Sequence, residues 1–113
     1  MLANPDYKKV PYSINGYRSF AEFYPFYLGE HRNKICRRLH VVGTLTSTTM
    51  LSYFVSNQMW SYIPLSIVTG YAFAWAGHFL FEKNKPATFK HPFYSFAGDM
   101  RLAFEVATLK RPF

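Results

Sequence analysis

The chain has 113 residues, half of them apolar and a fifth aromatic, and its 13 Lys and Arg outnumber 6 Asp and Glu to give a formal charge of +7. A soluble domain of this length normally carries about 25% charged residues, whereas here the charged fraction is 17% and strongly segregated. No Asp, Glu, Lys or Arg occurs among the 43 residues from Leu39 to Phe81. This pattern argues against an ordinary soluble globule, a disordered chain or a DNA-binding arm. The single cysteine, Cys36, excludes an internal disulfide and a CxxC zinc site.

Residues 1–18 are predicted to form an irregular lead-in, because Pro5, Pro11 and the Asn15-Gly16 turn signal interrupt any periodicity. They are polar and rich in tyrosine, so we expect no cleaved targeting segment here. Residues 19–113 are predicted to form a single membrane-embedded domain.

A first helix is predicted to begin near Phe20, because Ser19 and Glu22 have the spacing of a capping box. Pro25 lies too deep for a first-turn proline and is expected to kink the helix. The aromatic, amphipathic segment FAEFYPFYL is typical of a helix at an interface.

Two charge-free windows follow, at residues 39–56 and 62–81. A bilayer core needs about 20 helical residues, with about 17 as the lower limit, so each window is long enough to cross it. The first contains seven Ser and Thr residues. We expect the side of the helix that carries them to face a partner helix. The second carries Gly70, Ala74 and Gly77 at spacings of three and four residues, which favours close helix approach. The pair predicts a two-helix transmembrane hairpin.

Seven Lys and Arg precede the hairpin, six follow it and none lies in the turn, so both termini are predicted to be cytoplasmic. A last helix is predicted from about Ser95 to Leu109, with an apolar stripe opposite Arg101 and Glu105, lying on the membrane surface. The predicted fold class is therefore all-α: a helical integral membrane protein with a transmembrane hairpin and amphipathic interfacial helices at each end.

Four histidines, His31, His40, His78 and His91, are predicted to converge. In an antiparallel hairpin, His40 at the start of one span and His78 near the end of the other differ in depth by about one helical turn or less. An ionisable side chain within a span is costly and indicates function, and clustered imidazoles favour a metal site. His31 and His40 would lie on opposite sides of an uninterrupted helix, so a shared metal requires a break, for which Asn33 is the candidate.

Glu82 follows His78 by four residues and is predicted to orient an imidazole or to serve as a fifth ligand, unless it only pairs with Lys83 or Lys85. Ligand type alone leaves iron, zinc, copper and nickel open. The flanking basic residues Arg37, Arg38 and Lys85 fit either attraction to anionic lipid or binding of a carboxylate headgroup. No recognition motif favours nucleic acid as a partner.

The strings FYPFYLGEH, RRLHVVGT, GHFLFEKNKPATF and SFAGD occur in this order along the chain. From about Ser19 onward the sequence resembles the small membrane family typified by the fungal endoplasmic-reticulum 2-hydroxy fatty acid dioxygenase, which also has bacterial members. The resemblance implies an Fe(II)-dependent dioxygenase of fatty-acid α-oxidation that shortens a 2-hydroxy fatty acid by one carbon with O₂. It implies that His31, His40, His78 and His91 are the essential histidines.

Two alternatives stay open at this point. One is a non-catalytic membrane scaffold or lipid-binding protein with structural histidines, and the other is a histidine-ligated haem carrier, for which no CxxCH motif is present. The home membrane, either a bacterial inner membrane or the endoplasmic reticulum, and the oligomeric state are left open by the sequence.

Overall fold

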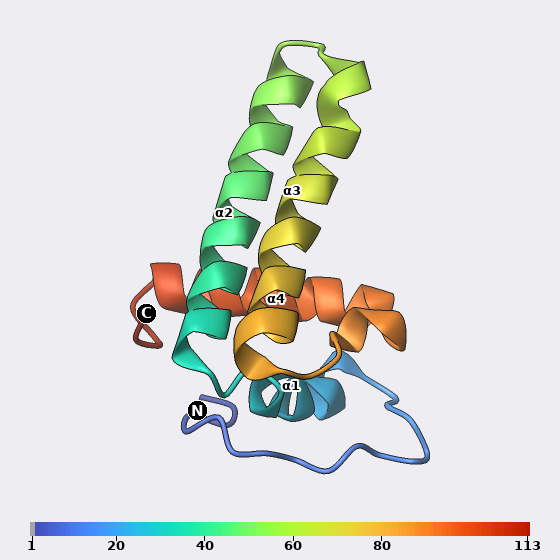
Figure 1. The fold of residues 1–113 in the computed structure, drawn as a ribbon, viewed down its shortest axis with the longest axis vertical. Coiled ribbons are helices and arrows are strands. Elements are labelled where there is room, and N and C mark those ends of the chain that lie inside the picture. The colour runs from blue at the N-terminus through green and yellow to red at the C-terminus, as the bar shows by residue number, and fades with distance from the viewer. Residues whose placement is uncertain (1) are drawn as a thin grey trace.

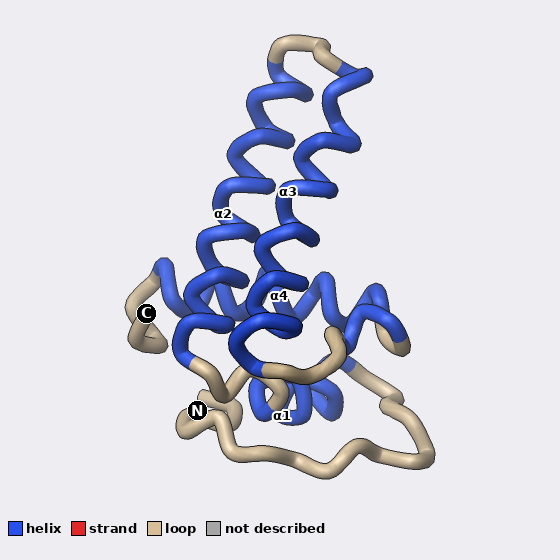
Figure 2. The backbone as a smooth tube through the Cα atoms, viewed as in Figure 1, coloured by secondary structure: helices blue, strands red, loops and turns tan. Residues whose placement is uncertain are grey.

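A computed structural model describes residues 2–113, so Met1, the first residue of the expected lead-in, lies outside the described part. Within that part the fold is all helical, as predicted, and contains no strand (Figure 2). The main helices, with the shorter helical segments between them, are α1 (Phe20–Gly29), α2 (Lys34–Ser56), a 3-10 turn (Trp60–Tyr62), α3 (Ile63–Ala76), a π-helical segment (Gly77–Glu82), a second 3-10 turn (Ala87–Phe89) and α4 (Pro92–Ala107). Helices α2 and α3 rise side by side as a stalk, while α4 and α1 lie across its lower end (Figure 1). We call this lower part, with residues 2–18, the base.

Small residues let α2 and α3 pack closely, as the sequence predicted. A Cβ atom on Gly43 would lie 2.4 Å from Cβ of Phe73, and one on Gly77 would lie 3.1 Å from Sγ of Cys36. The expectation that the hydroxyl side of α2 faces α3 holds only in part. Ser47 donates a hydrogen bond to the Ser66 carbonyl at 2.7 Å. The exposed hydroxyl residues of α2 are Thr48, Thr49, Ser52 and Ser56.

One described helical run, Trp60–Glu82, is long and apolar enough to cross a membrane by length and composition. Only 17% of its most apolar window is buried inside the protein, so most of this apolar surface is exposed. Helix α2 has the required length, with 23 residues, but its Ser and Thr residues lower its hydropathy. The structure therefore forms the antiparallel pair that was predicted, whereas a membrane-spanning character is supported for one of its two arms.

Helix α1 forms the core of the base. Ser19 caps it, accepting a hydrogen bond from the Glu22 amide, so the predicted start is confirmed. The buried residues of α1 are Phe23, Tyr24, Phe26, Tyr27, Leu28 and Gly29. The aromatic side chains of α1, which we expected at an interface, are covered by the lead-in and α4. Tyr7 and Val10 of the lead-in pack against this core, along with Leu102 of α4.

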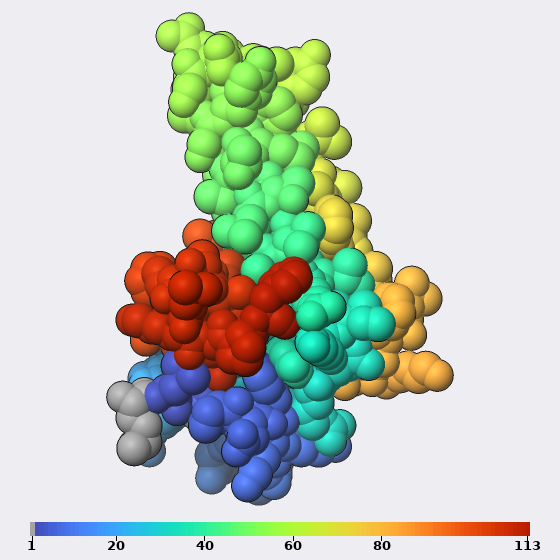
Figure 3. Space-filling view, turned by 90° about the vertical axis from the view of Figure 1, so that its left-hand side faces the viewer, coloured from blue at the N-terminus to red at the C-terminus, as the bar shows by residue number. Residues whose placement is uncertain are grey.

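Helix α4 begins three residues earlier than predicted, at Pro92, whose fixed φ suits a first helical position. Its outer face carries three exposed phenylalanines, Phe93, Phe96 and Phe104. The expectation that Glu105 faces solvent is wrong: Glu105 is 2% exposed. Sequence periodicity placed the charged side outward, but Glu105 has a buried partner, Arg111, 2.7 Å away. In the space-filling view the narrow stalk rises from the broad base that contains α4 (Figure 3).

Candidate metal centre

Three of the predicted histidines meet where the stalk joins the base. His31 lies between α1 and α2, His40 lies on α2 and His78 lies in the π-helical segment. All three are buried, with exposures of 1%, 4% and 2%. Their ring centroids are 4.3 Å apart for His31 and His40, 4.5 Å for His31 and His78, and 4.7 Å for His40 and His78. The predicted convergence of these three residues is therefore confirmed.

Each imidazole is held through Nδ1 by an oxygen atom. Nδ1 of His31 lies 2.6 Å from the Tyr27 carbonyl, and Nδ1 of His40 lies 3.0 Å from the Cys36 carbonyl. Nδ1 of His78 lies 2.6 Å from Oδ1 of Asn84. A carbonyl oxygen accepts a hydrogen bond, so each Nδ1 carries the proton and each Nε2 keeps a free lone pair.

The free Nε2 atoms of His31 and His40 face each other. Nε2 of His31 lies 3.1 Å from Nε2 of His40. Oxygen acceptors behind metal-ligating imidazoles fix their tautomer and orientation. The arrangement therefore suits a divalent transition metal, and the donor set of the chain fits one.

Local sequence signals explain how the chain builds this cluster. Asn33 caps α2, accepting hydrogen bonds from the amides of Ile35 and Cys36, so α1 and α2 are separate helices. This is the break that the spacing of His31 and His40 required. After the π-helical segment, Lys83 adopts a left-handed conformation with φ of 60°. The turn brings Asn84 back beneath His78.

Cys36 is also within reach of the cluster. One ligand atom from each of His31, Cys36, His40 and His78 can be chosen so that all lie within 4.8 Å of one another. However, Sγ of Cys36 lies 3.8 Å from Nδ1 of His40, the nitrogen that already has an acceptor. It also packs against Gly77. The thiol therefore lies behind the converging Nε2 atoms, and we interpret it as a packing residue.

Burial shifts the pKa values of residues in and beside the cluster. It lowers the pKa of His31 well below the usual range, and the neighbouring His40 and His78 act in the same direction. A neutral His31 keeps the lone pair that a metal needs. Asp99 of α4 lies beside the cluster, with Oδ1 4.0 Å from Nε2 of His40. Burial raises the pKa of Asp99 to about 7, although a hydrogen bond from Tyr27 acts the other way.

The structure does not bring His91 to this cluster. Nε2 of His91 lies 2.8 Å from the Tyr12 hydroxyl, and its ring packs against Phe23 and Tyr94. His91 directly precedes α4, whereas Asp99, the α4 residue beside the cluster, comes eight residues later. At about 1.5 Å per residue the two are separated by roughly 12 Å along the helix. Chain order alone does not show which end of α4 lies beside the cluster.

Glu82 bonds the backbone and not an imidazole nitrogen. Its Oε1 accepts a hydrogen bond from the Asn33 amide at 2.8 Å and so ties the end of the π-helical segment to the start of α2. The acceptor for His78 is Asn84. Asn84 was part of the motif GHFLFEKNKPATF but was not assigned a role.

The predicted headgroup residues have different environments. Arg37 donates to the carbonyls of His31 and Arg32 and lies 3.8 Å from the centre of the Tyr7 ring. Its guanidinium therefore stabilises the lower part of the fold. Arg38 lies over the Phe113 ring. Lys85 lines a pocket of about 520 Å³ together with Lys9 and Lys90.

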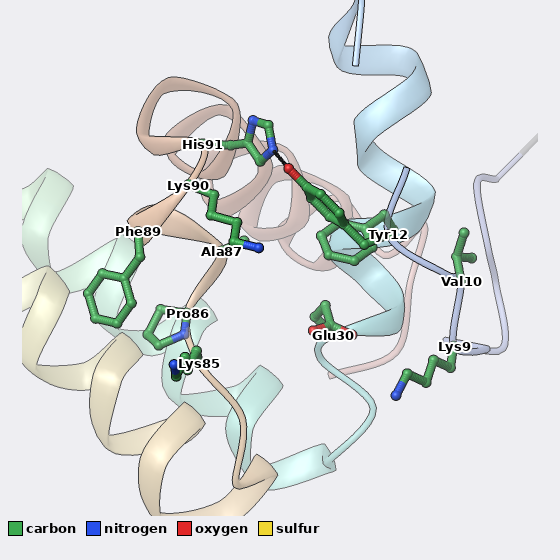
Figure 4. Close-up of a pocket in the computed structure, with 11 residues that line it drawn as sticks. Lys9, Val10, Tyr12, Glu30, Lys85, Pro86, Ala87, Phe89, Lys90 and His91 are labelled. Carbon is green, nitrogen blue, oxygen red and sulfur yellow. Dashed lines mark hydrogen bonds between the residues drawn. The ribbon is translucent and has the colours of Figure 1, made fainter. Parts of the chain in front are cut away.

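This pocket combines lysines with apolar walls, and Tyr12 and His91 join across one side (Figure 4). Its lining also includes Phe26, Phe89 and Glu30. Two of its residues are chain neighbours of a cluster histidine or of an imidazole acceptor: Glu30 precedes His31, and Lys85 follows Asn84.

The comparison with known families agrees with the strings singled out above. A family model described as "2-hydroxy-palmitic acid dioxygenase Mpo1-like" matches residues 17–111. The chain belongs to this Mpo1-like family. The match covers α1 to α4 and hence all three clustered histidines of this Mpo1-like chain. Comparison with curated proteins and with solved structures returned no match.

Proposed function

We propose that this Mpo1-like chain is an Fe(II)-dependent dioxygenase that shortens 2-hydroxy fatty acids by one carbon at a membrane interface. The observation that carries the proposal is the set of three buried imidazoles, His31, His40 and His78, whose Nδ1 atoms all have oxygen acceptors. The family name supports the substrate and the reaction type.

The proposed reaction balances without an external reductant. A 2-hydroxy acid and one O₂ give the acid one carbon shorter, CO₂ and water. The α-carbon loses three electrons and the carboxyl carbon loses one, so the substrate supplies the four electrons that reduce O₂. The α-hydroxyl is therefore part of the chemistry, and an unhydroxylated acid does not meet this balance.

Each part of the site has a role in this proposal. Bound Fe(II) would supply the reactivity of O₂ toward the substrate. His31, His40 and His78 would hold the ion, and their burial excludes water from it. Lys85, together with Lys9 and Lys90, would attract the substrate carboxylate to the pocket that they line. The proposal gives His91 no role as a ligand, because it bonds Tyr12. It gives Glu82 no role as an imidazole partner, because it bonds Asn33.

The fold supports a location in a bilayer. The stalk carries no charged side chain between Leu39 and Phe81, and the run Trp60–Glu82 is apolar enough to span. We propose that the stalk enters the membrane as a hairpin and that the base, with both termini, lies at the cytoplasmic face. The metal centre would then lie near the headgroup level, where a fatty acid presents its carboxylate.

Oxygen uptake by the purified full-length chain tests this function. With Fe(II) and a long-chain 2-hydroxy acid, the chain is expected to consume O₂ and yield the acid one carbon shorter, and to do neither with the parent acid. His40→Ala and His78→Ala are expected to lose most bound iron and the activity while keeping helical circular dichroism. His91→Ala is a matched control outside the cluster and is expected to retain iron.

The alternative is a non-catalytic scaffold or lipid-binding protein with structural histidines. Folded, iron-loaded protein that showed no hydroxyl-dependent oxygen uptake across medium and long chain lengths would favour it. A chain that bound no stoichiometric metal would also favour it.

A further inference from the structure

Asp99 of α4 lies on the donor side of the histidine cluster. Its Oδ1 is 4.0 Å from Nε2 of His40, the same nitrogen that lies 3.1 Å from Nε2 of His31. Metal–nitrogen and metal–oxygen bonds of about 2.1 Å place two donors of one ion at most about 4.2 Å apart. Both separations fall within that limit.

The position of Asp99 is fixed from two sides. Its neighbour Gly98 packs on the Tyr27 ring, where a Cβ atom would lie 2.9 Å from Cδ2 and Cε2. The Tyr27 hydroxyl donates a hydrogen bond to Oδ1 of Asp99, and the Tyr27 carbonyl faces Nδ1 of His31. Tyr27 therefore orients both the Asp99 carboxylate and the His31 imidazole.

No Lys or Arg within residues 2–113 forms an ion pair with Asp99, and the imidazole nearest to its carboxylate is that of His40. A carboxylate withdrawn from water is costly without a cation. A divalent ion among the three imidazoles would provide that cation. Most of the Asp99 side chain is covered, with 23% of it exposed against 4% for His40.

We propose that Asp99 is the fourth protein ligand of the metal held by His31, His40 and His78, and that Tyr27 is its positioning residue. This inference rests on the proposed metal centre and adds an anionic oxygen donor to it. Three imidazoles and one carboxylate suit a divalent transition ion better than imidazoles alone, because the carboxylate neutralises part of its charge.

Metal affinity of the full-length chain in detergent tests the assignment, with Co(II) as the probe. Asp99→Asn keeps the shape and an acceptor for the Tyr27 hydroxyl but loses the charge. The Kd for Co(II) is expected to rise about 100-fold or more, since even the loss of a group behind a ligand costs about 10- to 100-fold. The visible Co(II) spectrum is expected to change as well.

Two further variants separate the roles. Tyr27→Phe removes the hydroxyl and keeps the ring, so the Kd is expected to rise about 10-fold with little change in the Co(II) spectrum. Asp6→Asn, at an exposed position of the lead-in, loses the same charge and is expected to leave both readouts unchanged.

An Asp99→Asn variant with the wild-type Kd and spectrum would overturn the assignment and leave Asp99 as a partner of Tyr27 only. Wild-type protein that bound no Co(II) would overturn it too. If Asp99→Asn weakens binding but the wild type shows no oxygen uptake, the ligand assignment stands and the dioxygenase function fails. If Asp99→Asn binds Co(II) as the wild type does and the wild type is active, the ligand assignment fails and the dioxygenase function stands.

Discussion

At the scale of single residues, the chemistry of the site depends on the atoms behind the imidazoles. Two of the three acceptors are backbone carbonyls, of Tyr27 and Cys36, which no side-chain substitution removes. The third is the side chain of Asn84, whose amide nitrogen also donates to the Glu30 carbonyl at 3.0 Å. Asn84 is therefore the acceptor that mutation can test.

Asn84→Ala is expected to weaken metal binding by about 10- to 100-fold, because His78 loses the oxygen that fixes its tautomer. Competition with a chelator measures this change. Asn84→Asp keeps an oxygen at the same place and is the control, expected to bind metal more nearly as the wild type does. Equal affinity for Asn84→Ala and wild type would show that His78 does not need this acceptor.

At the scale of helices, the close approach of α2 and α3 holds His40 and His78 at one level. Gly43 is the tightest point, because a Cβ atom there would lie 2.4 Å from Cβ of Phe73. Gly70 is less crowded, because a Cβ atom there would lie 3.2 Å from Oγ of Ser47. The two glycines on the same interface therefore allow a graded comparison.

Gly43→Ala is expected to destabilise the chain by about 1–3 kcal/mol, since overpacking pushes the two helices apart. Gly70→Ala should cost less, because a serine side chain can shift. Thermal unfolding in detergent micelles measures both. A Gly43→Ala melting temperature at or above that of Gly70→Ala would contradict the role of this contact.

At the scale of the whole molecule, a buried ion pair joins the two ends of the chain. Arg111 donates to Glu105 at 2.7 Å and to the Ala3 carbonyl, and the Tyr24 hydroxyl donates to Glu105 at 2.6 Å. Burial raises the pKa of Glu105, but the hydrogen bonds from Arg111, Tyr24 and Arg101 outweigh it, so the pKa ends below its ordinary value of 4.5.

This lowered pKa gives the pH dependence of stability a definite sign. The contribution of Glu105 is fully present above pH 4.5 and is lost as the pH falls through the depressed folded value. Glu105→Gln leaves the buried Arg111 without its counterion and is expected to cost about 3 kcal/mol at neutral pH. Melting temperatures at pH 7 and at acidic pH check this, since the gap between wild type and variant should narrow in acid.

The stalk and the base also predict a transmembrane arrangement. Asn57, at the tip of the stalk, and Lys110, in the base, should lie on opposite sides of the membrane, with Lys110 cytoplasmic. Single cysteines at these positions can be labelled with an impermeant reagent in oriented vesicles. Cys36 is fully buried and can remain. Labelling of both positions from one side would exclude the hairpin as a spanning unit.

The sequence by itself determined the features that local patterns encode. The capping box at Ser19, the break at Asn33 and the small residues Gly70 and Gly77 predicted where α1 begins, where the chain breaks and where the second arm approaches α2 closely. These depend on short-range hydrogen bonding and on helix periodicity. Both can be recognised from the sequence of a few helical turns.

Only the tertiary structure decided which residues surround the histidines. Asp99 and Asn84 reach His40 and His78 through the crossing of α4 and the turn at Lys83, and neither arrangement follows from spacing along the chain. The same crossing leaves His91 outside the cluster, bonded to Tyr12, and buries Glu105 against Arg111. Periodicity indicates the faces of a helix, but the packed neighbours decide which face turns inward.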